Sequence, residues 1–181
     1  EPYELVPIMS QAVQNGNTSL VIVCNSISDA VTSLITRNEK IGQFEMIAVK
    51  VPGTERAERA ENLADLAMLT GGRAFIMAAG DATKDVEIAD MGQTRRAWAN
   101  KDHFGIMSGG GDPHELRLTV EGLVKRYENA DDPEIRSALL PRIGRLMGGL
   151  AIVYVGGYSE QDSDARQEVA KRTVTAMRAI L

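Results

Sequence analysis

The residues in this chain that could do chemistry are few and scattered. Three consecutive glycines, Gly109–Gly111, precede the expected start of a helix, where backbone amides can bind phosphate. The lysine and serine or threonine of a P-loop and the spacing of a dinucleotide-binding fingerprint are missing there, so a flexible turn is favoured over a phosphate-binding enzyme. His103 and His114 are the only histidines, and no carboxylate or thiol stands at metal-ligand spacing around them. We therefore expect no metal site.

Two further candidates are equally weak. Cys24 is the single cysteine, so we expect an inert thiol at the end of a strand and no intramolecular disulfide, which fits a reducing compartment. Arg95 and Arg96 flank Trp98 closely enough to suggest a nucleic-acid contact. However, 20 basic against 25 acidic residues leave a net charge of −5. No run approaches ~18 apolar residues. Nucleic acids and membranes are therefore not expected as partners, and the chain shows no catalytic site.

The elements that would position functional residues alternate between helix and strand in the first half of the chain. Unbroken apolar runs bounded by turn residues predict buried strands, and apolar residues at helical spacing predict the helices between them. The expected strands are 19–23, 46–51 and 73–77, and the expected helices are 3–14, 29–40 (capped by Ser28) and 57–69. This alternation predicts an α/β core with crossover connections. A length of 181 residues suits one domain, or one domain with an appendage.

The second half of the chain has a different pattern, with longer helices and a short hairpin. Residues 95–100 and 104–108 are expected to pair as antiparallel strands around Lys101-Asp102. The other expected elements are helices from Pro113 to about Asn129, from Pro133 to Met147 and over 164–181, and a strand over 151–157.

The two helices nearest the N-terminus carry more apolar surface than a helix needs to face one core. Their apolar stripes span about 160°, against the ~100° that a surface helix requires. Either both stripes are buried, between the sheet and the neighbouring helix, or they line an exposed groove, which usually marks a binding surface. The stripes are Leu5, Ile8 and Ala12 beside Val6, Met9 and Val13 in the first helix, and Ala30, Leu34 and Ile41 beside Val31 and Ile35 in the second.

Six short motifs occur in an order and spacing that match a known family. They are the segment from Leu5 to Gly16 with its Pro7, Lys50-Val51-Pro52-Gly53, Leu69-Thr70-Gly71-Gly72, Gly92-Gln93 with Arg96 and Asn100-Lys101-Asp102, Arg145-Leu146-Met147-Gly148-Gly149, and Ala176-Met177-Arg178-Ala179. Together they resemble the group I chaperonins, the GroEL type. The resemblance covers nearly all 181 residues.

The resemblance implies a fold and a domain organisation. Residues 1–149 would be an apical, polypeptide-binding domain without its leading strands, built as chaperonin-like helix–sheet layers. Residues 150–181 would be a short α+β part of the intermediate domain, with Gly148 and Gly149 as the hinge between the two. The chain begins at Glu1 and ends within a helical pattern, so we expect it to be a fragment of a longer protein.

The resemblance also implies a function. In that family, paired apical helices bind non-native polypeptide and the mobile loop of a co-chaperonin. The matching positions here are Val6, Met9, Val31, Ile35 and Thr36, and Val13 continues the first stripe. This implies a cytoplasmic chaperone that assists protein folding in a homo-oligomeric, heptameric ring. ATP and Mg²⁺ would bind the parent's equatorial domain, with no cofactor in this fragment. If these stripes are exposed, polar substitutions at Val31 and Ile35 should leave stability unchanged.

Three positions depart from the family pattern. Thr36 stands where the family is typically apolar, and Thr54-Glu55-Arg56 replaces a Phe-Gly-Asp segment. Arg172 stands at the position of the family's catalytic aspartate, and a guanidinium cannot accept the proton that a carboxylate base would. The fragment itself is not expected to be an enzyme. The alternative is a divergent chaperonin-like protein with impaired ATP hydrolysis, in which this segment mainly transmits conformational change.

Overall fold

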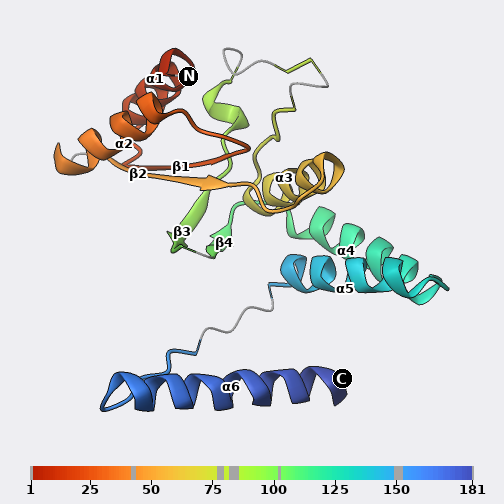
Figure 1. The fold of residues 1–181 in the computed structure, drawn as a ribbon. Coiled ribbons are helices and arrows are strands. Elements are labelled where there is room, and N and C mark those ends of the chain that lie inside the picture. The colour runs from red at the N-terminus through yellow and green to blue at the C-terminus, as the bar shows by residue number, and fades with distance from the viewer. Residues whose placement is uncertain are drawn as a thin grey trace. The chain divides into compact units, whose positions relative to one another are not determined.

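The computed structural model describes residues 2–41, 44–76, 80–81, 86–101, 103–148 and 153–180. The chain divides into two compact units, Glu1–Met147 and Gly148–Leu181 (Figure 1). The first unit combines helices with two small sheets, and the second contains one long helix. The expected mixture of helix and sheet is confirmed at this coarse level.

A parallel pair of strands forms the first sheet. Strands β1 (Ser19–Cys24) and β2 (Glu45–Lys50) pair in a register that sets Val21 opposite Ile47. Parallel strands need a crossover connection, and helix α2 (Asp29–Ile41) provides it. The amide of Val31 donates to the Ser28 hydroxyl (3.4 Å), so Ser28 caps α2 as the sequence predicts.

Helix α1 (Pro2–Gln14) contacts α2, and α2 contacts β2 (Figure 1). Apolar side chains from both helices and both strands meet in one hydrophobic core, which excludes water from one side of each helix. Its buried members are Leu5, Ala12, Val31, Phe44 and Met46, and Met9, Leu20, Ile22, Leu34 and Ile35 pack against them, partly buried.

Helix α3 (Arg56–Thr70) follows and ends at Gly71, whose φ of 74° is the left-handed conformation that favours glycine. A single 3-10 turn, η3 (Ile88–Asp90), precedes strands β3 (Thr94–Ala99) and β4 (Phe104–Gly109), which pair antiparallel. The hairpin expected from the sequence is confirmed. A Cβ at Gly105 would lie 2.6 Å from the ring of Trp98, so the strand needs glycine opposite this side chain.

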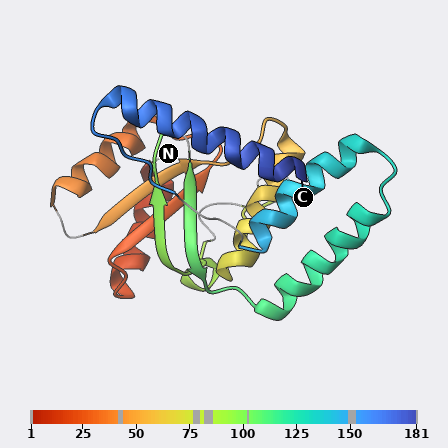
Figure 2. The ribbon, with the colours of Figure 1, turned by 90° about the horizontal axis from the view of Figure 1, so that it is seen from below.

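Helices α4 (Pro113–Glu128) and α5 (Pro133–Leu146) run side by side in opposite directions (Figure 2). Asp112 and Asp132 cap them, each accepting a hydrogen bond of 2.8 Å from a first-turn amide, and a proline follows each cap. A second hydrophobic core lies between them: Leu123, Leu139, Ile143 and Leu146 are buried, and Leu69 at the end of α3 packs against them.

Two expected strands are not formed in the described residues. Residues 73–76 have no strand partner; the amide of Ile76 donates to the Asp81 carboxylate (2.9 Å) instead, and residue 77 lies outside the described part. Residues 153–157 also lack a strand, and residues 151–152 lie outside it. A run with strand-like composition becomes a strand only where a neighbour takes its backbone hydrogen bonds. The last helix, α6 (Glu160–Ile180), begins four residues earlier than expected, at 160 rather than 164.

Candidate functional site

A hollow of about 240 Å³ lies between α1 and α2. Its lining is Val6 from α1 together with Ala30, Ser33, Leu34 and Arg37 from α2. The four α2 residues are spaced i, i+3, i+4 and i+7, so they form one stripe along the helix. We call this hollow and the exposed α1 stripe beside it the α1–α2 groove.

The exposed α1 stripe consists of Tyr3, Val6 and Val13, whose spacings of three and seven residues place them on one side of the helix. Val6 is 48% exposed and Val13 53% exposed, and Tyr3 is more exposed still. Exposed apolar side chains that share one side of a helix, beside a hollow, form a candidate binding surface. Of the predicted site residues, Val6 and Val13 are therefore the ones that present most of their apolar surface.

The other predicted residues lie deeper or carry a satisfied polar group. Met9 and Ile35 are partly buried against the core, and Val31 is only 5% exposed. The expectation that Val31 is exposed is wrong, because its stripe faces the sheet, and the expectation that a polar residue there leaves stability unchanged loses its basis. Thr36 is exposed, and its hydroxyl donates to the Thr32 carbonyl (3.0 Å) rather than facing a ligand as a free donor.

Sequence analysis missed Ser33 and Arg37 as lining residues. Both were passed over because they are polar, although their i+3 and i+7 spacing from Ala30 is the signal that would have placed them on the stripe. Arg37 is exposed, and no carboxylate of the described residues forms an ion pair with it. The lining thus combines three apolar side chains with the Ser33 hydroxyl and with one guanidinium at the end nearer the C-terminus of α2.

The triglycine does not form a phosphate-binding loop in this structure. The amide of Gly110 donates to the Gln93 carbonyl (2.8 Å), and the amide of Gly111 donates to the Leu69 carbonyl (3.2 Å). Both amides are therefore occupied by backbone partners at the end of α3 and the start of the hairpin. The flexible turn expected from the sequence is instead a fixed backbone contact, and the phosphate-binding alternative loses its basis.

The remaining candidates from the sequence do not converge on a site. His103 and His114 are both exposed, as are Arg95 and Arg96. Within the residues that the structure describes, no three His, Cys, Asp or Glu side chains are grouped so as to hold a metal ion. No helix of the described part combines the length and apolar character needed to cross a membrane.

The predicted hinge lies close to the division of the chain. Gly148 has a φ of +70°, follows the last turn of α5 and begins the second unit; Gly149 lies outside the described residues. Further along, Arg172 is a solvated residue of α6: its side chain is 79% exposed and pairs with Glu168 one turn earlier (3.2 Å). Such a pair contributes only about 0.3–0.5 kcal/mol to the free energy of unfolding.

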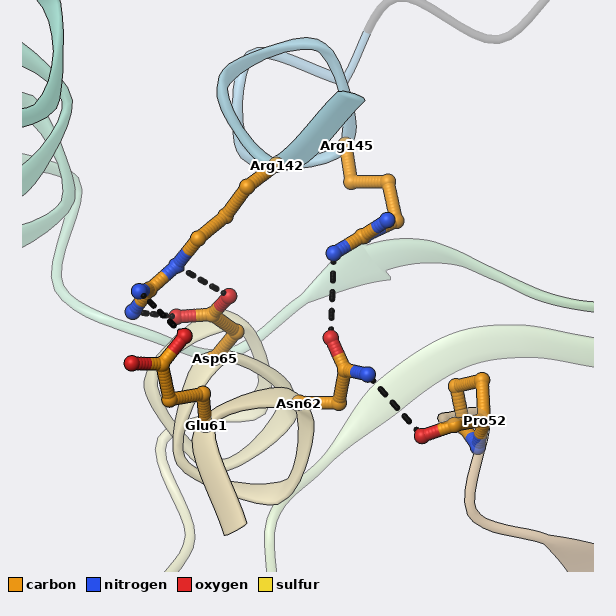
Figure 3. A network of polar contacts seen from close by, with 6 residues as sticks. All are labelled: Pro52, Glu61, Asn62, Asp65, Arg142 and Arg145. Carbon is orange, nitrogen blue, oxygen red and sulfur yellow. Dashed lines mark hydrogen bonds and ion pairs between the residues drawn. The ribbon is translucent and has the colours of Figure 1, made fainter. Parts of the chain in front are cut away.

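A polar network fixes α5 against α3 (Figure 3). The guanidinium of Arg142 donates two hydrogen bonds to the Asp65 carboxylate (2.9 and 2.8 Å) and one to Glu61 (2.9 Å). Arg145 donates to the amide oxygen of Asn62, which in turn donates to the Pro52 carbonyl. Asp65 is buried, and its hydrogen bond raises the pKa of Arg142. Every member is paired within the fold, so the network is structural.

Cys24 provides a test of burial at the end of β1. Burial raises the pKa of its thiol, because a thiolate is poorly solvated there. Since the thiolate is the nucleophile, we expect iodoacetamide to alkylate Cys24 several-fold more slowly in the folded chain than in the urea-unfolded chain at the same mildly alkaline pH. Mass spectrometry of timed samples measures both rates. Equal rates would contradict the burial of this thiol.

No model of a known protein family matches this chain.

Proposed function

We propose that this chain binds non-native polypeptide segments in the α1–α2 groove, as the apical domain of a group I chaperonin does. The observation that carries the proposal is the largely apolar hollow between two helices, which Val6 lines, together with the α1 stripe that continues to Val13; both valines are about half exposed in a folded chain. Unfolded chains expose mixed apolar side chains, so a binder needs apolar area rather than a shape that fits one ligand.

The packing beneath the groove supports this role. Val31 and Leu5 are buried in the core below, so the exposed side chains rest on a fixed layer. Met9, partly buried beside them, has a flexible side chain that can adapt to different apolar partners. Binding then costs little rearrangement of the groove itself, which leaves more of the contact energy for affinity.

The wider biological setting follows from the sequence resemblance. The partners would be unfolded client proteins and a co-chaperonin, and the parent protein would be a cytoplasmic homo-oligomeric ring, heptameric in that family. Its ATP and Mg²⁺ would bind an equatorial domain outside this sequence. The finer assignment of residues 1–149 to an apical domain and of 150–181 to an intermediate domain belongs to this proposal.

A second candidate is favoured by the division of the chain at Gly148. A glycine in the left-handed conformation at the junction of two compact units can absorb the backbone change of a hinge. Residues 148–181 would then transmit conformational change in a parent whose ATP hydrolysis is impaired, since the resemblance sets Arg172 at the position of the family's catalytic aspartate.

The groove is tested by removing its exposed apolar side chains. We expect the double variant Val6→Ser, Val13→Ser to bind a permanently unfolded protein, reduced and carboxymethylated α-lactalbumin, at least about tenfold more weakly. Half-burying two valines contributes on the order of 1.5–3 kcal/mol in total, and 1.4 kcal/mol is a factor of ten. Fluorescence anisotropy of the labelled client measures the affinity. The melting temperature should change little, because both side chains are half exposed.

The matched control removes exposed apolar side chains outside the α1–α2 groove. Leu118 on α4 and Leu140 on α5 are 55% and 56% exposed, so the variant Leu118→Ser, Leu140→Ser loses at least as much exposed apolar area. It should bind the client like the unmodified chain. Equal weakening in both variants would show general apolar adhesion, and unchanged binding in the groove variant would overturn the proposal.

A further inference from the structure

The lining of the α1–α2 groove carries one charge, that of Arg37, at one end of an apolar stripe. We propose that the groove selects polypeptide segments in which an acidic side chain follows or precedes a short apolar stretch by about three residues. This inference rests on the proposed function and specifies its ligand class.

The spacing comes from the geometry of α2. Ala30 and Arg37 are seven residues apart on one stripe, which at 1.5 Å per residue is about 10 Å along the helix. An extended peptide rises about 3.3 Å per residue, so about three residues cover that length. Apolar side chains of the ligand would contact Ala30 and Leu34, and an acidic one would reach the guanidinium.

Only the Arg37 end of the groove is complementary in charge to an acidic side chain. Arg37 has no carboxylate partner among the described residues, so its donors are available, and a guanidinium binds a carboxylate through two parallel hydrogen bonds. Asp29, in the first turn of α2, is exposed at the opposite end, where it would repel a second acidic group. The acidic side chain of a bound segment therefore lies at the Arg37 end.

Ser33, one turn before Arg37, lines the groove, and its hydroxyl can donate a further hydrogen bond to the same acidic group, whereas the two threonine hydroxyls of α2 are not free to do so. Thr32 donates to the Ser28 carbonyl (3.2 Å) and Thr36 donates to the Thr32 carbonyl (3.0 Å), so both hydroxyl protons are engaged within the helix. A phospholipid surface is the less suitable anionic partner, because one guanidinium on a chain of net charge −5 provides little attraction to a membrane.

The test compares three labelled peptides that share two apolar residues and differ three positions later, where they carry Asp, Ser or Lys. We expect the unmodified chain to bind the Asp peptide about three- to tenfold more tightly than the Lys peptide at low salt, with Ser between, and the difference to shrink as salt is added. Arg37→Gln should remove the preference and Arg37→Glu should reverse it. Arg117→Glu, an exposed charge reversal on α4, should keep the original order.

The outcomes separate this inference from the proposed function. Equal binding of all three peptides, with loss of binding in the Val6→Ser, Val13→Ser variant, would overturn the charge selection and leave the groove intact. No binding of any peptide or unfolded client would overturn the groove itself. Vesicles of phosphatidylserine and phosphatidylcholine serve as the membrane probe: binding that depends on Arg37 there but not with the peptides would overturn the choice of a polypeptide ligand.

Discussion

Replacing Arg142 by methionine is expected to lower the free energy of unfolding by about 3–5 kcal/mol. Methionine keeps most of the aliphatic stem but leaves the Asp65 carboxylate without the two hydrogen bonds of 2.9 and 2.8 Å that the guanidinium donates. The Asp65 side chain is only 8% exposed, so water cannot replace those bonds. Urea titration followed by circular dichroism measures the loss.

Two further variants distinguish the contribution of the buried Arg142–Asp65 pair from that of the exposed Arg142–Glu61 pair. Glu61→Gln should cost less than about 1 kcal/mol, because the Glu61 side chain is 61% exposed and its ion pair with Arg142 is largely solvated. The double variant Asp65→Leu, Arg142→Met should recover most of the loss, since it removes both buried charges together. Equal destabilisation by Arg142→Met and Glu61→Gln would show that burial of Asp65 is not the cause.

The dependence of this pair on pH has a definite sign. Hydrogen bonding to Asp65 raises the pKa of Arg142 above its ordinary value. A base with a raised pKa in the folded state stabilises the fold at every pH below its unfolded value, and the contribution fades only as pH rises through the folded pKa. The guanidinium therefore remains charged through the neutral and mildly alkaline range, and raising the pH within that range should not weaken the pair.

The features that could be predicted from the sequence are the ones that local chemistry determines. Asp112-Pro113 and Asp132-Pro133 mark helix starts because a capping carboxylate and a proline each act within one turn. The hairpin of β3 and β4 joins strands that are neighbours in sequence. In contrast, the apolar run at 151–157 has strand composition, but whether it pairs depends on a distant neighbour that no local pattern specifies.

The candidate groove was only half predictable for the same reason. Periodicity indicates which side chains of α1 and α2 share a stripe, and it correctly places Val6 and Val13 together. It does not indicate which of two adjacent stripes faces the sheet, so Val31 was expected on the surface although it is buried. Arg37 belongs to the groove only because α1 lies beside α2, a contact between helices separated by a whole strand.

Replacing Gly111 by alanine is expected to lower the free energy of unfolding by about 2–3 kcal/mol. A Cβ at this position would overlap the backbone carbonyl oxygen of Met68 and lie 3.0 Å from the carbonyl carbon of Leu69. Those atoms belong to the last turn of α3, so they cannot rotate away as a side chain would. The hydrogen bond from the Gly111 amide to Leu69 would lengthen or break as the backbones separate.

The chain offers a matched substitution with the opposite expected sign. Gly122 lies within α4, and a Cβ there would meet nothing within 4 Å, so Gly122→Ala should raise the free energy of unfolding by about 0.5–1 kcal/mol through helix propensity alone. Both variants add one methyl group, so urea titration of the pair measures the effect of the local environment. If Gly111→Ala proved neutral or stabilising, the triglycine would be the flexible turn that its sequence indicates rather than a fixed contact with α3.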